Sequence, residues 1–234
     1  MRRTLLLALL LLCIQATGIC AQSVVMPVGF ANLEGGASNI FPFSCAPALT
    51  EIRYMQVYDG QQVGTGYITE LRFRQDGTDG MDFPPTNLPS PVIVLSSTAS
   101  PVDGLDPFFG ANFGSDFKLV WNGENAISST SDGGDPPHFD IIIRLTEAFR
   151  FDAAAGQNLL MDVVLFSCVS TTPFDAVASS SDGVSRMFVS PFTEPTATDI
   201  DTLGLVTEFV FDPDLLFLDG FESGDTSLWS DVAP

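Results

Sequence analysis

Two acidic stretches carry the side chains best suited to binding a metal ion, at residues 76–82 and 132–140. Calcium prefers carboxylate oxygens as ligands. Neither stretch has the alternating acids, fixed glycine and terminal glutamate of an EF-hand loop. Asp-Gly pairs also form tight β-turns, and we favour that interpretation. The calcium candidates are Asp76, Asp79, Asp82, Asp132, Asp135 and Asp140.

Hydrolytic chemistry would have to use the single histidine, His138. The run at residues 179–182, Ser-Ser-Ser-Asp, supplies the other residue types of a serine triad, but no Gly-x-Ser-x-Gly elbow is present. A glycosidase needs two carboxylates at a defined separation, and 29 acidic residues nominate no particular pair. We therefore predict that the protein is not an enzyme, with a secreted hydrolase as the less favoured alternative.

Glycan binding would use exposed aromatic side chains as platforms. Trp121, Tyr54, Tyr58 and Tyr67 are the candidates. All four lie in strand-like runs, where packing in a core or across strands explains them equally well. A carbohydrate-binding module is therefore an alternative function.

The charge balance excludes some classes of partner. The chain carries 29 acidic and 9 basic residues, and Arg2 and Arg3 belong to a segment that we expect to be removed. Such a negative surface repels nucleic acid and anionic lipid, so we predict binding to neither. The hydrophobic content of 45% indicates a folded chain rather than a disordered acidic one.

Residues 1–21 are predicted to be a signal peptide. Two arginines precede an apolar run at residues 4–12, and small residues follow it, the last being Ala21. The run is far shorter than the ~20 apolar residues that a membrane span needs. Cleavage after Ala21 would make Gln22 the first residue of the exported protein. A lipoprotein acylated at Cys20 is the competing interpretation, but it lacks the small residue that usually precedes such a cysteine.

Removal of the signal peptide leaves two cysteines, Cys45 and Cys168. In an oxidising compartment we expect them to form a disulfide. Closing so long a loop would stabilise the fold by up to ~5 kcal/mol in the chain-entropy model. Two buried free thiols, or a catalytic cysteine, are the alternatives that we weigh against it.

Short β-prone segments separated by turn-forming pairs make up the rest of the chain. They predict an all-β fold, an antiparallel β-sandwich that is jelly-roll-like, in one domain at residues 22–211. The predicted strands are residues 52–58, 67–74, 91–97, 117–121, 139–145, 159–166, 184–189 and 203–211.

Alternation of apolar and polar residues indicates which strands are half-buried. At residues 67–74 it predicts a buried face of Tyr67, Thr69, Leu71 and Phe73. No stretch after the signal peptide sustains a helical apolar stripe.

Four runs of residues resemble segments of a group of exported bacterial proteins of unknown function. The runs are residues 53–58, 68–74, 184–186 and 201–207. They are similar to the β-rich bodies of PEP-CTERM and choice-of-anchor proteins, in which one such domain is joined to varied C-terminal sorting tags. The resemblance covers most of residues 50–211. It implies an exported β-rich fold, and it implies no activity and no functional residue.

The tail at residues 212–234 departs from the PEP-CTERM pattern, because it has no Pro-Glu-Pro signal before an apolar span. Its segment 219–230, DGFESGDTSLWS, resembles a terminal motif that recurs on exported proteins of Gram-negative bacteria. That resemblance implies a sorting signal read by the export machinery. A last strand and turn, with Phe221 and Trp229 packed on the domain, explains the aromatic residues equally well.

These observations predict an exported, acidic, non-enzymatic β-sandwich at the surface or in the extracellular matrix of a Gram-negative bacterium. Its role would be structural or in recognition. We expect no cofactor other than calcium at the acidic turns. The expected partners are an extracellular glycan, other surface proteins or the export machinery.

Overall fold

The fold is that of a computed structural model, which describes residues 22–44, 49–89, 91–123, 125–131, 133–167 and 169–212. This part of the chain is nearly all β, as the sequence predicts. The helical segments are α1 (Gly60–Val63), η1 (Phe109–Asn112) and η2 (Ala153–Ala155). The strands are β1 (Gln22–Met26), β2 (Ala37–Asn39), β3 (Ile52–Tyr58), β4 (Gly66–Phe73), β5 (Phe83–Leu88), β6 (Val92–Thr98), β7 (Lys118–Asn122), β8 (Asn125–Ser129), β9 (Ile141–Phe151), β10 (Asn158–Leu165), β11 (Phe174–Ala178), β12 (Val184–Val189), β13 (Asp199–Asp201), β14 (Leu203–Leu205) and β15 (Thr207–Phe211).

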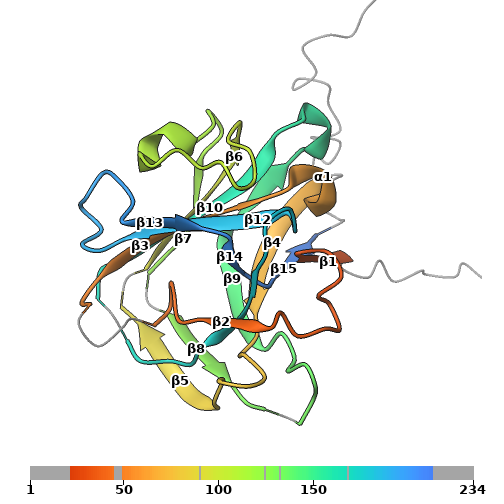
Figure 1. The fold of residues 1–234 in the computed structure, drawn as a ribbon, viewed down its shortest axis with the longest axis vertical. Helices are drawn as coiled ribbons and strands as arrows, with labels where there is room; N and C mark the ends of the chain where they lie inside the picture. The colour runs from red at the N-terminus through yellow and green to blue at the C-terminus, as the bar shows by residue number, and fades with distance from the viewer. Residues whose placement is uncertain are drawn as a thin grey trace, which may run out of the picture.

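Two antiparallel sheets form the body of the protein (Figure 1). Sheet I has the strand order β1-β15-β4-β9, and sheet II has the order β13-β12-β3-β10-β6-β7. Two smaller sheets, β14-β11-β2 and β5-β8, complete the fold. The predicted antiparallel β-sandwich is confirmed.

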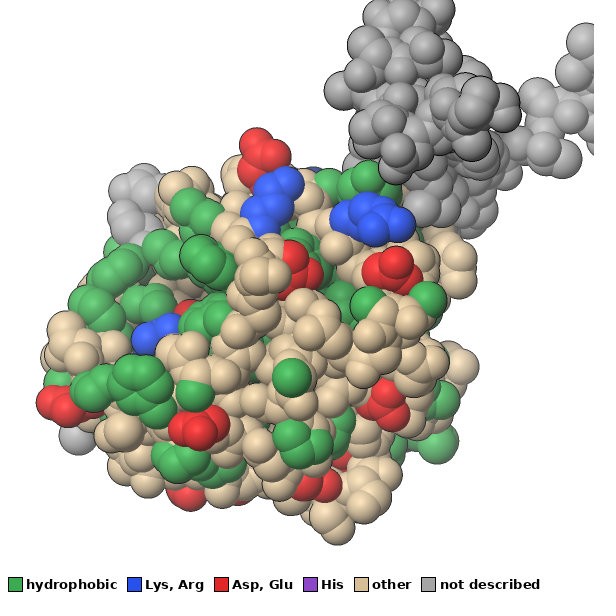
Figure 2. Space-filling view, turned by 90° about the horizontal axis from the view of Figure 1, so that it is seen from above, with side chains coloured by type: hydrophobic (Ala, Val, Ile, Leu, Met, Phe, Trp, Pro, Cys, Tyr) green, Lys and Arg blue, Asp and Glu red, His purple; other side chains and the backbone are tan. Residues whose placement is uncertain are grey.

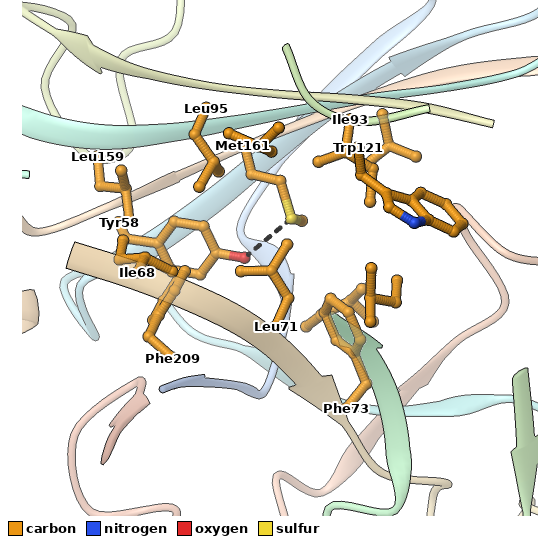
Figure 3. Close-up of a cluster of buried hydrophobic side chains, with 14 of the residues drawn as sticks. Tyr58, Ile68, Leu71, Phe73, Ile93, Leu95, Trp121, Leu159, Met161 and Phe209 are labelled. Atoms are coloured by element: carbon orange, nitrogen blue, oxygen red, sulfur yellow. Dashed lines mark hydrogen bonds between the residues drawn. The ribbon is translucent and has the colours of Figure 1, made fainter. Parts of the chain in front are cut away.

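The main core fills the space between sheets I and II. Tyr58 and Met161 of sheet II meet Leu71 and Phe209 of sheet I, and all four are fully buried (Figure 3). The rings of Tyr58 and Phe209 meet edge-on with their centroids 4.8 Å apart, a favourable geometry for aromatic pairs. The Tyr58 hydroxyl lies 3.0 Å from the Thr207 hydroxyl, so the buried polar end of the ring has a partner.

The burial of β4 departs from the predicted alternation. Leu71 and Phe73 are fully buried, and so is Ile68, whereas Tyr67 and Thr69 are half-buried. A β-bulge after Ile68, where β4 pairs with β9, breaks the alternation and changes which face the following side chains take. The prediction that Tyr67 and Thr69 share the buried face of Leu71 is therefore wrong.

The outer face of sheet II is also covered in part. The segment that joins β6 to β7 contains η1 and packs Leu105 and Phe109 onto Met55, Leu160 and Met187 of the sheet. This second, smaller core fixes the segment against the sheet. It therefore positions the aromatic residues that follow η1.

Several predicted features lie outside the described residues: the signal peptide at residues 1–21, Cys45 and Cys168, Asp132, and residues 213–234 of the tail. The disulfide and the sorting motif therefore stay predictions. Among the described residues, no helix is long and apolar enough to cross a membrane.

Candidate functional site

A pocket of about 360 Å³ opens on the outer face of sheet II, where the β6–β7 segment leaves part of the sheet uncovered. We call it the Arg53 pocket. Its walls combine apolar side chains with one partly buried ion pair. The lining residues are Arg53, Val94, Gly110, Phe113, Phe117 and Asp162.

The ion pair comes from two neighbouring strands of sheet II. In β3, Arg53 and Met55 share the outer face, while Tyr54 points to the main core. Met55 is the Cα partner of Asp162 on β10, so Asp162 lies diagonally opposite Arg53. Arg53 Nε donates to Asp162 Oδ1 at 2.9 Å, and Nη2 donates to Oδ2 at 3.0 Å. The pair is therefore bidentate, the strongest geometry for this kind of contact.

Aromatic rings hold the guanidinium from the side of the β6–β7 segment. The Arg53 guanidinium carbon lies 4.5 Å from the ring centroid of Phe109 and 5.9 Å from that of Phe113. Both distances are within the range of a cation–π interaction. These contacts hold the Arg53 side chain in position, and Nη1 is the guanidinium nitrogen that the ion pair with Asp162 does not use.

The opposite charges of Arg53 and Asp162 offset each other, so the ion pair gives the pocket no net charge. Burial raises the pKa of Asp162, and the hydrogen bonds and charge of Arg53 act in the opposite direction. Only 4% of the Asp162 surface is exposed, so its carboxylate reaches solvent far less than Arg53 does. The donor that a ligand can meet is therefore the arginine.

The rim of the pocket exposes hydrophobic side chains. Phe117 is 63% exposed and Leu119, on β7, is 43% exposed. The rings of Phe113 and Phe117 contact each other edge-on with centroids 6.1 Å apart. Figure 2 shows one face of the molecule, on which hydrophobic side chains gather to one side and acidic groups are scattered among them. Exposed apolar groups around a concave site are typical of binding surfaces.

A second cluster consists of three acidic residues, Glu34, Asp76 and Asp175, with carboxylate oxygens all within 4.8 Å of one another. Asp175 is fully buried and accepts from Arg74 Nε at 2.7 Å and from Gly35 N at 2.8 Å. These hard oxygen ligands are the type that calcium takes. They are the described residues whose geometry could hold a cation.

Glu34 is the least satisfied member of this cluster. Its Oε1 accepts from Gly77 N at 2.7 Å, whereas its Oε2 is buried and has no partner among the described residues. Burial raises the pKa of Glu34 above its ordinary value of 4.5, and the charges of Asp175 and Asp76 add to that shift. Burial also raises the pKa of Asp175. Burial and the repulsion between the carboxylates therefore make Glu34 and Asp175 harder to ionise than isolated carboxyl groups.

Glu34→Gln is expected to raise the unfolding temperature at neutral pH by a few degrees. Because the folded state raises the pKa of Glu34, the stability linked to its proton is fully present below about pH 4.5 and is lost as the pH rises through the folded pKa. Glutamine keeps the oxygen that Gly77 needs and carries no charge. Thermal unfolding measured from pH 4 to pH 8 tests this.

Glu194→Gln is the matched control, because it removes the same charge from an exposed position. We expect the advantage of Glu34→Gln to shrink toward pH 4 and to exceed that of the control at pH 7. Equal effects of the two variants at every pH would show that the cluster contributes nothing specific.

Among the residues that the structure describes, the predicted calcium ligands form no cluster of their own. Asp76 alone joins the acidic cluster. Asp79 accepts from the Ser38 hydroxyl, and Asp82 accepts from Ser131 N. These contacts hold loops in place, as the turn interpretation predicts.

The loop at residues 133–140 carries the remaining described candidates. Asp140 accepts from the Ser129 hydroxyl at 2.8 Å and from Thr130 N at 2.7 Å, next to the end of β8. Asp135 lines a separate polar pocket of about 320 Å³ together with His138. Asp135 and Asp140, the described members of the second acidic stretch, therefore lie in different environments and do not form one site.

His138 and the serine run at residues 179–182 lie near opposite ends of β4. Phe139 stacks on Arg74, just past the C-terminal end of that strand, with 4.7 Å from guanidinium to ring centroid. The serine run leads to Gly183, whose carbonyl accepts from Asp59 N at 2.8 Å, beside α1 and the N-terminal end of β4. A strand of this length spans about 25 Å. The structure therefore does not assemble the triad.

Three of the four aromatic residues named as glycan platforms are buried. Tyr58 is fully buried and Trp121 is 4% exposed (Figure 3). Tyr54 is fully buried as well, whereas Tyr67 is half-buried. Tyr54, Tyr58 and Trp121 pack in the main core because they lie on the inner face of sheet II. In the described part of the chain, the exposed aromatic side chains are instead Phe108 and Phe117 of the β6–β7 segment, together with Phe166 after β10.

No protein-family model matches this chain, and no curated protein or solved structure is significantly similar to it. The fold and the Arg53 pocket define the class of protein as an all-β sandwich with a concave aromatic site. The resemblance to choice-of-anchor bodies stays a prediction.

Proposed function

We propose that this is an exported, non-enzymatic β-sandwich protein that acts in recognition or structure at the bacterial cell surface or in the extracellular matrix. The Arg53 pocket is its binding site. Export rests on the predicted signal peptide at residues 1–21 and sorting on the tail motif, neither of which lies among the described residues.

The observation that carries the proposal is the combination of an exposed aromatic rim with a fixed arginine. Phe117 offers apolar surface to a ligand, and Arg53 is held by Asp162 and Phe109 before any ligand arrives. Groups fixed in advance lose little entropy on binding, which favours affinity. Both Asp162 oxygens accept from Arg53, so neither is available to take a proton from a substrate. This arrangement suits binding rather than acid–base catalysis.

The mature protein is expected to sediment with extracellular matrix and cell-envelope material from the producing bacterium, and Phe117→Ala is expected to weaken this binding by about tenfold. The reason is that truncation removes the most exposed wall of the pocket. Phe108→Ala is the matched control, since Phe108 is 50% exposed on the same segment and does not line the pocket. Retention that does not distinguish the two variants would refute the assignment of the pocket as the binding site.

A further inference from the structure

The Arg53 pocket constrains the charge of its ligand. The chain has 29 acidic residues, and the one cation in the pocket is already neutralised by Asp162. An anionic ligand would meet the repulsion of the whole protein with no free positive charge to offset it. A cationic ligand would meet Arg53 Nη1, which carries hydrogens only. The net charge therefore disfavours an anion, and the donor at Arg53 disfavours a group that can only donate, so together they favour a neutral ligand with an oxygen acceptor.

The pocket also constrains the shape and polarity of the ligand. The ion pair with Asp162 uses Arg53 Nε and Nη2, so Nη1 is the guanidinium nitrogen from which an oxygen of a ligand can accept a hydrogen bond. Phe113 and Phe117 supply ring surface next to it. A sugar ring fits both demands, because it is neutral, carries hydroxyl oxygens around its edge and has C–H faces that pack on aromatic rings.

The size of the pocket agrees with a small recognition element. A volume of about 360 Å³ is at the lower end of the range of ligand pockets. Phe117 is 63% exposed, so a ligand chain can continue past the rim. The pocket thus suits one residue of a longer polymer rather than a large isolated molecule.

We propose that the Arg53 pocket binds a sugar residue of a neutral glycan, with a hydroxyl oxygen accepting from Arg53 Nη1 and the sugar face against Phe117. This inference rests on the proposed function, because it names the ligand class of the same site. It differs from the sequence-based glycan hypothesis in the residues that make the contact, since Trp121 and the tyrosines take no part.

Isothermal titration of the mature chain with neutral oligosaccharides (cellohexaose, chitohexaose and maltohexaose) and with acidic hexagalacturonate tests the inference. We expect binding to at least one neutral oligosaccharide and none to the acidic one. Phe117→Ala should weaken the binding by about tenfold. Phe117→Trp should retain it, because a larger ring still offers a face, and Phe108→Ala should behave as the unmodified protein.

The outcomes separate this inference from the proposed function. If no neutral oligosaccharide binds while binding to the matrix material still depends on Phe117, the ligand is not a sugar and the pocket remains a binding site. Equal or tighter binding of hexagalacturonate would overturn the neutral class. If matrix binding is also insensitive to Phe117→Ala, both proposals fail.

Discussion

Arg74→Met is expected to destabilise the folded protein by about 3–5 kcal/mol, the cost of leaving a buried charge without its partner. Arg74 is 1% exposed, and its partner Asp175 is fully buried. The guanidinium also donates to the carbonyls of Phe30, at 2.9 Å, and Leu33, so it ties the loop after β1 to β4. Urea unfolding followed by circular dichroism measures the loss.

Two further variants make this prediction specific. Arg150→Met removes an arginine that is 55% exposed and lies 4.0 Å from Asp152, and it should cost less than about 1 kcal/mol. Adding Asp175→Leu to Arg74→Met should recover part of the lost stability, because no unpaired buried charge remains. An Arg74→Met variant as stable as Arg150→Met would show that the buried pair is not needed for folding.

Gln56→Leu is expected to cost about 3 kcal/mol, although leucine has nearly the same size and is apolar. Gln56 is fully buried on β3. Its side-chain amide bonds to the backbone N–H and C=O of Leu205 on β14, as the backbone of a neighbouring strand would. Its Oε1 accepts from Leu205 N at 2.8 Å, and its Nε2 donates to Leu205 O at 3.0 Å. Its Oε1 also accepts from the Tyr54 hydroxyl. Each buried polar group left without a partner costs about 1–3 kcal/mol.

Gln62→Leu provides the comparison, because Gln62 is exposed on α1 and bonds only to Asp59 in the described structure. It should change the stability by less than about 0.5 kcal/mol. Chemical denaturation of both variants decides the point. If Gln56→Leu matches the stability of the unmodified protein, the contact between β3 and β14 contributes no net free energy.

Much of the strand pattern could be predicted from local sequence. The predicted strand at residues 52–58 coincides with β3. The single predicted strand at residues 203–211 is instead divided at Val206 into β14 and β15, which belong to different sheets. Alternation continues across this break, so a local pattern does not reveal it.

The candidate site was not predicted, although part of its signal is present in the sequence. Arg53 and Asp162 are single charged residues within apolar runs, and each is a costly residue to bury alone. Their pairing depends on strands separated by more than a hundred positions in the chain. Nothing in the local sequence distinguishes Phe113 and Phe117 from phenylalanines of the core, because the exposure of a ring depends on which distant segments cover it.

Short alternating segments and turn-forming pairs are enough to predict the antiparallel β class, and composition alone establishes the strongly acidic character of the protein. Those properties depend on residues close together in the chain or on composition alone. By contrast, the pairing of charges, the exposure of aromatic residues and the position of the Arg53 pocket follow only from the folded structure. These depend on the register between distant strands and on how the β6–β7 segment covers sheet II, because burial and ion pairing are properties of residues brought together by folding.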